Sequence, residues 1–117
     1  MTSPTQRTIK WIKENGWTYD VVERWIKMPM GGHRKDFLGC IDIIAINKNQ
    51  TIGIQSTGTA FSSHKKKILD NPNALKWIKA GNKLILIGWR KLKLKRGGKA
   101  MRWRPRLYEF TIEDFQS

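Results

Sequence analysis

The sequence predicts an α/β domain in which a mixed central β-sheet is flanked by helices. Two observations predict it. Residues 40–46 and 51–56 are apolar, β-branched runs separated by a polar four-residue turn, which is typical of a hairpin. A helical pattern at 71–81 runs directly into the apolar run 83–90, which is typical of a crossover onto a neighbouring strand. A chain of 117 residues supports one core, so we expect a single domain over residues 1–117.

The first third of the chain predicts a helix, a strand and a loop. Residues 3–6 (Ser-Pro-Thr-Gln) form a capping box with proline in the first turn, and Gly16 predicts the end of that helix. The stretch 17–27 is rich in aromatic and β-branched residues and predicts a strand. The glycine- and lysine-containing stretch 29–35 predicts a flexible basic loop.

The second half of the chain alternates helices and strands around the central hairpin. The remaining elements are a short helix capped by Ser62 or Ser63 and ending at Leu69, a helix from Asn71 to about Gly81, a basic C-terminal β-hairpin that pairs 91–96 with 101–110 and turns near Gly97, and a last helical turn at 111–114.

The charge balance of the chain indicates which class of partner it binds. The chain has 23 Lys and Arg residues against 9 Asp and Glu residues, a formal charge of +14, and such an excess favours a polyanion, with nucleic acid ahead of a membrane surface. No apolar run approaches the roughly 18 residues of a membrane-spanning helix, and the first residues lack the apolar region of a signal peptide. The single cysteine, Cys40, excludes an internal disulfide and a Cys-based zinc site, so we expect a cytoplasmic location.

The central hairpin predicts a pair of polar side chains. A symmetric turn at 47–50 pairs residues whose numbers sum to 97, so Asp42 faces Gln55 with Cβ atoms about 4.5–5.5 Å apart. Ile43 and Ile54 then share the opposite, apolar face, and Thr57 continues the polar one. An aspartate within an apolar strand needs a partner. Mg²⁺ held by the carboxylate and the amide oxygen is one possibility, and a nearby Lys, Arg or backbone amide is the other.

Residues 36–46 and 52–57 resemble the core of the PD-(D/E)XK nuclease superfamily, and most closely its small phage and bacterial members related to archaeal Holliday junction resolvases. The resemblance implies a restriction endonuclease-like fold and a metal-dependent DNA endonuclease that acts as a homodimer in a prokaryotic or phage-infected cell. Asp42 matches the motif aspartate, Gln55 the Glu/Gln position and Thr57 the position of the usual lysine. The acidic residue that many members carry on the first helix is absent, since residues 6–8 are Gln, Arg and Thr.

The implied reaction is metal-assisted phosphodiester hydrolysis. Asp42, Gln55 and the carbonyl of Ser56 would hold Mg²⁺ or Mn²⁺, and Glu23 or Asp36 would supply a second carboxylate. Glu23 is alternatively a solvated residue paired with a neighbouring cation, and Asp36 alternatively caps the turn before Phe37. The candidates to replace the missing lysine are His33, Lys35, Lys65 and Lys66.

Basic residues gather in two stretches, 65–67 and 90–106. Lysines alternate with leucines at 91–95 and arginines alternate at 102–106, which predicts a two-stranded basic ribbon that follows a phosphate backbone. Trp103, between two arginines, is the candidate for stacking on a base. The residues expected to contact DNA are Lys35, Lys65, Lys66, Lys93, Lys95, Arg96, Arg102 and Arg104.

Three functions remain open at the level of sequence. The first is a Mg²⁺-dependent DNA endonuclease, possible only if Gln55 and Thr57 permit catalysis. The second is a catalytically degenerate DNA-binding protein that keeps the nuclease fold, which the absence of lysine at position 57 favours. The third, an RNA-binding or translation-associated protein, leaves the pairing of Asp42 with Gln55 without a purpose.

Overall fold

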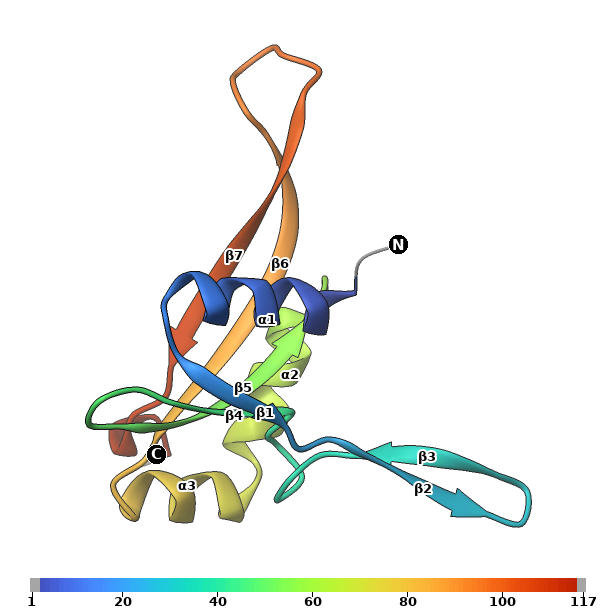
Figure 1. The fold of residues 1–117 in the computed structure, drawn as a ribbon, viewed down its shortest axis with the longest axis vertical. Helices are drawn as coiled ribbons and strands as arrows, with labels where there is room; N and C mark the ends of the chain where they lie inside the picture. The colour runs from blue at the N-terminus through green and yellow to red at the C-terminus, as the bar shows by residue number, and fades with distance from the viewer. Residues whose placement is uncertain (1–2, 116–117) are drawn as a thin grey trace.

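The computed structural model describes residues 3–115 and contains a five-stranded mixed sheet, three α-helices and a separate two-stranded ribbon (Figure 1). The strands of the sheet lie in the order β1-β4-β5-β6-β7. The elements are α1 (Pro4–Glu14), β1 (Thr18–Val21), β2 (Arg24–Met28), β3 (Gly31–Lys35), β4 (Ile43–Ile46), β5 (Thr51–Thr57), α2 (Phe61–Leu69), α3 (Pro72–Lys79), β6 (Lys83–Lys93), β7 (Met101–Glu109) and a 3₁₀ turn at Ile112–Phe115.

The strand pairing follows the predicted hairpin and crossover. Strands β4 and β5 are antiparallel, and Ile43 pairs with Ile54 and Ala45 with Ile52, which is the predicted register. Strand β5 continues through α2 and α3 into β6, which lies parallel to β5. Strands β6 and β7 are antiparallel, and β1 closes the other edge against β4. The predicted α/β class is therefore confirmed.

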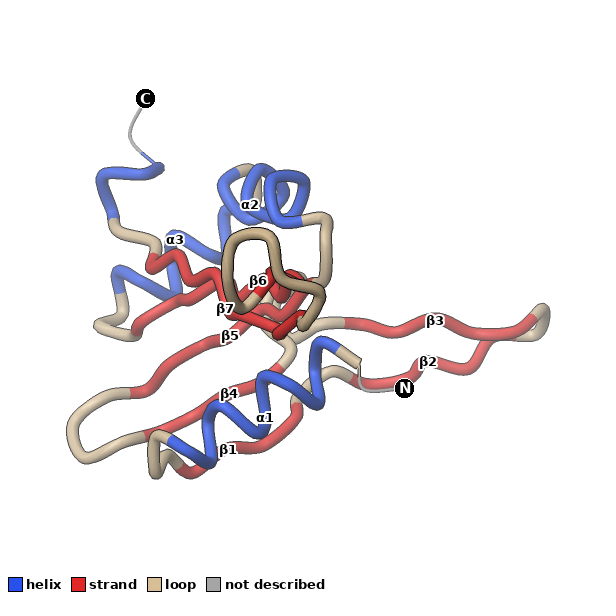
Figure 2. Tube along the Cα trace, turned by 90° about the horizontal axis from the view of Figure 1, so that it is seen from above, coloured by secondary structure: helices blue, strands red, loops and turns tan. Residues whose placement is uncertain are grey.

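Helices cover the two faces of the sheet, α1 on one side and α2 and α3 on the other (Figure 2), and an apolar cluster lies on each face. On one face α1 packs Ile12 against the isoleucines of β4, β5 and β6. On the other face α2 and α3 pack Phe61, Ile68 and Ala74 against Leu84 and other apolar residues. Because both faces of the central strands are buried, these strands consist of nearly continuous apolar residues.

Local hydrogen bonds define the helix starts. The capping box at α1 is present: the Ser3 hydroxyl accepts from the Gln6 amide, and the Ser3 amide donates to the Gln6 side chain, each at 3.2 Å. Asn71 caps α3 by accepting from the Asn73 amide at 2.9 Å. The prediction that Ser62 or Ser63 caps α2 is wrong. That helix begins at Phe61 after Ala60, without a side-chain cap, and the buried Phe61 ring is packed at Gly88 of β6.

The prediction of one strand over 17–27 and of a flexible loop over 29–35 is also wrong. The chain breaks between β1 and β2, where the amides of Val22 and Glu23 both donate to the Asp42 carbonyl, at 2.8 and 3.2 Å. Strand β2 then leaves the sheet and pairs with β3 as a separate antiparallel ribbon. The residues of β3, Gly-Gly-His-Arg-Lys, have low strand propensity, so backbone pairing with β2 determines their conformation.

Two antiparallel ribbons project from the body of the molecule in different directions (Figure 1). One is the outer part of β6 and β7, and the other is formed by β2 and β3. Strand β6 runs unbroken for 11 residues, so the predicted strand 83–90 and the first arm of the predicted C-terminal hairpin are one element. Across residues 3–115, the helices are too short or too polar to cross a membrane.

Candidate functional site

Three carboxylates converge at one end of the sheet. One oxygen from each of Glu23, Asp36 and Asp42 lies within 4.8 Å of the others. Asp42 directly precedes β4, while Glu23 precedes β2 and Asp36 follows β3. The ribbon formed by β2 and β3 leaves and rejoins the body at this point, so its two ends bring Glu23 and Asp36 to Asp42. The structure thus unites the predicted aspartate with both candidates for a second carboxylate.

Asp42 and Gln55 face each other, as the register predicts. The Gln55 side-chain nitrogen donates to Asp42 Oδ2 at 2.9 Å, and the Ser56 amide donates to the same oxygen at 3.0 Å. The Ser56 hydroxyl donates at 3.4 Å. These two residues therefore hold Asp42 through nitrogen and hydroxyl donors, whereas the expected ligand atoms were the amide oxygen of Gln55 and the carbonyl of Ser56. The amide oxygen of Gln55 reaches a cation beside Asp42 only if the amide group turns over.

The second oxygen of Asp42 has no such partner. Asp42 is 3% exposed, and its Oδ1 is the one buried side-chain nitrogen or oxygen among residues 3–115 without a hydrogen bond. A buried, unpaired polar atom is destabilising unless a ligand satisfies it. Oδ1 is therefore the atom of this cluster that most needs a cation or a proton.

The carboxyl group of Asp42 is buried beside two other acids. Burial raises the pKa of Asp42 to about 8, and the carboxylates of Asp36 and Glu23 contribute to the increase, while the hydrogen bond from the Ser56 amide opposes it. At neutral pH and without a cation, Asp42 therefore holds a proton. A bound divalent cation would release that proton and stabilise the ionised form.

The carboxylates line a cavity of about 590 Å³ between the start of α1, the end of β5 and α2. Arg34 reaches across the ribbon, and its Nη1 lies 3.2 Å from Glu23 Oε1. The alternative expected for Glu23 was a solvated side chain paired with a neighbouring cation; in the structure its side chain is 17% exposed and its partner is Arg34 on β3. The other residues lining the cavity are Ser3, Pro4, Thr5, Val21, Gln55, Ser56 and His64.

Thr57 lies at the end of β5 and contacts His64. Thr57 is 5% exposed, and its Oγ1 lies 3.3 Å from His64 Nδ1. The same Nδ1 lies 2.8 Å from the Ala60 carbonyl. A carbonyl oxygen only accepts, so Nδ1 carries the hydrogen and Nε2 is the basic nitrogen of the neutral ring. His64 lines the carboxylate cavity.

The basic residues of β6 and β7 do not share one face. Lys91 pairs with Trp103 and Lys93 with Met101, whereas Arg102 and Arg104 pair with Leu92 and Arg90. Directly paired residues point to the same side of a sheet, so the lysines and the arginines lie on opposite faces. The expectation that the two alternating runs align is therefore wrong, because the long connection after β6 sets a different register.

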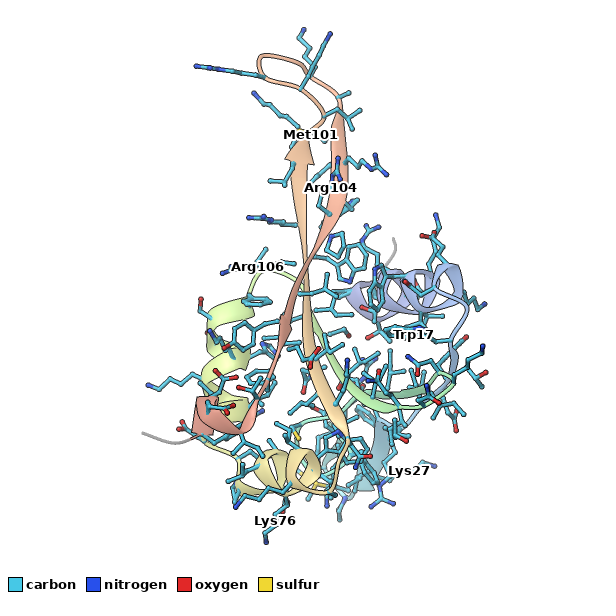
Figure 3. All side chains as sticks on the ribbon, turned by 90° about the vertical axis from the view of Figure 1, so that its left-hand side faces the viewer. Trp17, Lys27, Lys76, Met101, Arg104 and Arg106 are labelled. Carbon is cyan, nitrogen blue, oxygen red and sulfur yellow. The ribbon has the colours of Figure 1, made fainter. Side chains whose placement is uncertain are left out.

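The other candidate DNA contacts have varied surroundings. Figure 3 shows Arg104 on the part of β7 that extends beyond the body. Trp103 is covered on one side by Arg7, whose guanidinium lies 4.0 Å from the ring centre. Lys65 is not free in solvent, since its ammonium lies 3.9 Å from the Tyr108 ring centre. The exposed candidates are Lys35, Lys66, Lys93, Lys95, Arg96, Arg102 and Arg104.

Sequence reasoning does not assign Arg34 or Thr5 to the cavity that both residues line. Arg34 becomes a partner of Glu23 only because β2 and β3 pair, and that pairing has no strong sequence pattern. Thr5 lies in the first turn of α1, and its hydroxyl is 3.2 Å from that of Ser56. The capping box locates this turn in the sequence but gives no indication of what it faces.

Comparison of the chain with protein-family models, with curated proteins and with solved structures finds no match.

Proposed function

We propose that the protein is a divalent-metal-dependent DNA endonuclease of the restriction endonuclease-like type. The observation that carries this proposal is the cluster of Glu23, Asp36 and Asp42 around a buried oxygen that has no hydrogen bond. The cluster lines an open cavity on a protein of net charge +14, to which a phosphodiester backbone is attracted. The three carboxylates can share a divalent cation with a phosphate of the DNA, while the basic residues elsewhere on the protein attract the rest of the backbone.

The donor set fits Mg²⁺ or Mn²⁺. Both ions prefer oxygen, and Mg²⁺ sites in enzymes commonly combine one or two carboxylates with water and a substrate phosphate. Asp42, Asp36 and Glu23 supply the carboxylates, and Gln55 supplies a neutral oxygen after its amide turns over. When bound, the ion would act as a Lewis acid that polarises a phosphate and lowers the pKa of a bound water molecule.

The chain's own residues perform the remaining tasks. Ser56 fixes the orientation of the Asp42 carboxylate through its amide, a backbone donor held in the sheet. His64 takes over from the lysine that Thr57 replaces: it lines the same cavity, and its Nε2 is free to exchange a proton with water or with the leaving oxygen. The exposed arginines of β7 hold the phosphate backbone.

Nicking of supercoiled plasmid DNA tests the proposal. We expect nicking with Mg²⁺ or Mn²⁺, none with EDTA, and none by Asp42→Asn, which removes the charge and keeps the shape. Filter binding should show that Asp42→Asn retains its DNA affinity. The matched control is Asp70→Asn, an exposed aspartate at the end of α2 that should nick like the wild type. Nicking that survives EDTA or Asp42→Asn would exclude this mechanism.

A second candidate is a DNA-binding protein that keeps the nuclease fold without catalysis. The buried Thr57 favours it, because a hydroxyl bonded to His64 brings no positive charge to a phosphate. The plasmid assay separates the two candidates, since this one predicts DNA binding with no nicking under any metal.

A further inference from the structure

The ribbon of β2 and β3, residues 24–35, is a basic arm that projects from the body of the protein (Figure 1). It contains four Lys and Arg residues and one histidine, and no acidic residue lies between its ends. Each strand has five residues, which gives a length of about 17 Å. That length exceeds the depth of either groove of duplex DNA, about 7.5–8.5 Å.

The tip of the arm is apolar and unusually exposed. Met28 is 54% exposed and Met30 is 99% exposed, with Pro29 between them. Pro29, Met30 and the glycines that follow have no strong side-chain hydrogen-bonding groups, so the side chains of the tip cannot read base edges by hydrogen bonds. Such an apolar tip is unfavourable in water and indicates a surface that becomes covered on binding.

One side of the arm is shaped by an exposed tryptophan. Trp25 is 59% exposed, and its indole lies over Gly32 on the facing strand, where a Cβ atom would come within 2.7 Å of the ring. Arg34 is the direct cross-strand neighbour of Trp25 on the same face. The arm therefore combines a flat aromatic surface with cations on its sides and methionines at its end.

Charge distinguishes the two partners that such an arm could meet. A second copy of the chain carries the same charge of +14, so docking this basic arm on it brings like charges together. Duplex DNA offers phosphates to the sides of the arm and a stack of bases to its tip. Methionine and proline are among the residues that wedge between base steps in proteins that bend DNA.

We propose that the arm of residues 24–35 enters a groove of duplex DNA and inserts its Met28–Met30 tip between adjacent base pairs, which unstacks them and bends the duplex. The inference rests on the proposed function in taking DNA as the partner, but it does not require catalysis. The arm ends at Glu23 and Asp36, so a duplex gripped by the arm lies beside the carboxylate cluster. The protein thus recognises the duplex by the ease with which its base pairs unstack where the tip inserts, and by its phosphates along the sides of the arm.

Fluorescence of 2-aminopurine in a duplex tests the insertion, because this base brightens when it is unstacked. The assay uses Asp42→Asn with EDTA, so that no cleavage occurs, and a set of duplexes with the probe at successive positions. We expect a several-fold rise in fluorescence at one or two positions. A double variant, Met28→Ser with Met30→Ser, should lose this rise while filter binding still detects the complex. Both side chains are exposed, so we expect the fold to remain intact.

The matched control is Ile46→Ser, which removes an exposed apolar side chain (48% exposed) at the far end of β4 and should leave the fluorescence rise unchanged. Absence of any rise in a duplex that is demonstrably bound would overturn the inference. A change of oligomeric state in the double variant, measured by sedimentation, would instead assign the tip to a contact between copies. Plasmid nicking is scored separately, so failure of the hydrolytic proposal and failure of the arm proposal give different results.

Discussion

The two oxygens of the Asp42 carboxylate have opposite surroundings. Oδ2 accepts from the side chain of Gln55 and from the amide of Ser56, while the buried Oδ1 has no hydrogen bond. Most buried side-chain oxygens have at least one hydrogen-bond partner, so Oδ1 is an exception. The asymmetry and the nearby acids Asp36 and Glu23 indicate a group arranged for a ligand. Burial, followed by Asp36 and Glu23, raises the pKa of Asp42 to about 8.

The raised pKa predicts how stability depends on pH in the metal-free protein. The native state holds a proton on Asp42 up to about pH 8, whereas the unfolded chain loses it near pH 4. Between these values the native state binds more protons, so the free energy of unfolding falls as pH rises from about 4 to 8 and then levels off. Thermal unfolding in EDTA measures this slope.

Asp42→Asn removes the titrating group, so that variant should show a flatter pH profile over the same range than the wild-type protein. A wild-type profile that rises between pH 5 and 8, with no difference from Asp42→Asn, would show that the carboxyl group is ionised throughout and would contradict the assigned environment.

The element that determines the site is the hairpin of β4 and β5, and its packing depends on Gly53. A Cβ atom at Gly53 would lie 2.7 Å from Ile41 Cδ1 and 3.0 Å from Trp77 Nε1. The missing side chain lets α3 and the segment before Asp42 approach the hairpin closely. The strand that carries Gln55 is thereby held against the segment that carries Asp42.

Gly53→Ala should lower the free energy of unfolding by about 1–3 kcal/mol, because overpacking a filled core displaces its neighbours. Denaturant unfolding measures the change. The matched control is Gly58→Ala at the end of β5, where a Cβ atom would meet Pro4 at an ordinary contact distance of 3.7 Å. Equal stability of the two variants would show that the hairpin is not packed as tightly as described.

The same elements show what the sequence can predict. The hairpin register follows from two facts: Ile43, Ala45, Ile52 and Ile54 must share a buried face, and the turn is symmetric. The ribbon of β2 and β3 could not be predicted, since Gly31 and Gly32 have low strand propensity and the pairing depends on the backbone alone. Glu23 and Asp36 are recognisable as candidate acids, but their convergence depends on that unpredicted ribbon.

Over residues 3–115, two projections that carry basic residues extend from the body that holds the carboxylate cavity. The outer part of β6 and β7 carries lysines on one face and arginines on the other, and the β2–β3 arm leaves the body in a different direction (Figure 1). A net charge of +14 disfavours self-association and favours binding to a polyanion. The distribution of charge predicts that phosphate contacts dominate the affinity for DNA.

DNA affinity should therefore fall steeply with salt. We expect the plot of log K against log salt concentration to have a negative slope with a magnitude of about 4 or more. The double variant Arg102→Ala with Arg104→Ala should reduce that magnitude by about 2. Fluorescence anisotropy with a labelled duplex measures both. The control is the double variant Lys76→Ala with Lys79→Ala on α3, which lies at the opposite end of the molecule from the outer part of β6 and β7 (Figure 3). A salt-independent affinity would exclude DNA as the partner.

The most direct test is an anomalous difference map from crystals grown with Mn²⁺, recorded at the manganese absorption edge. We predict a peak among Glu23, Asp36 and Asp42, within coordination distance of Asp42 Oδ1, and its loss in Asp42→Asn crystals. Manganese bound only elsewhere, or a cluster that stays free of metal at saturating Mn²⁺, would contradict the assignment of these three acids as a metal centre.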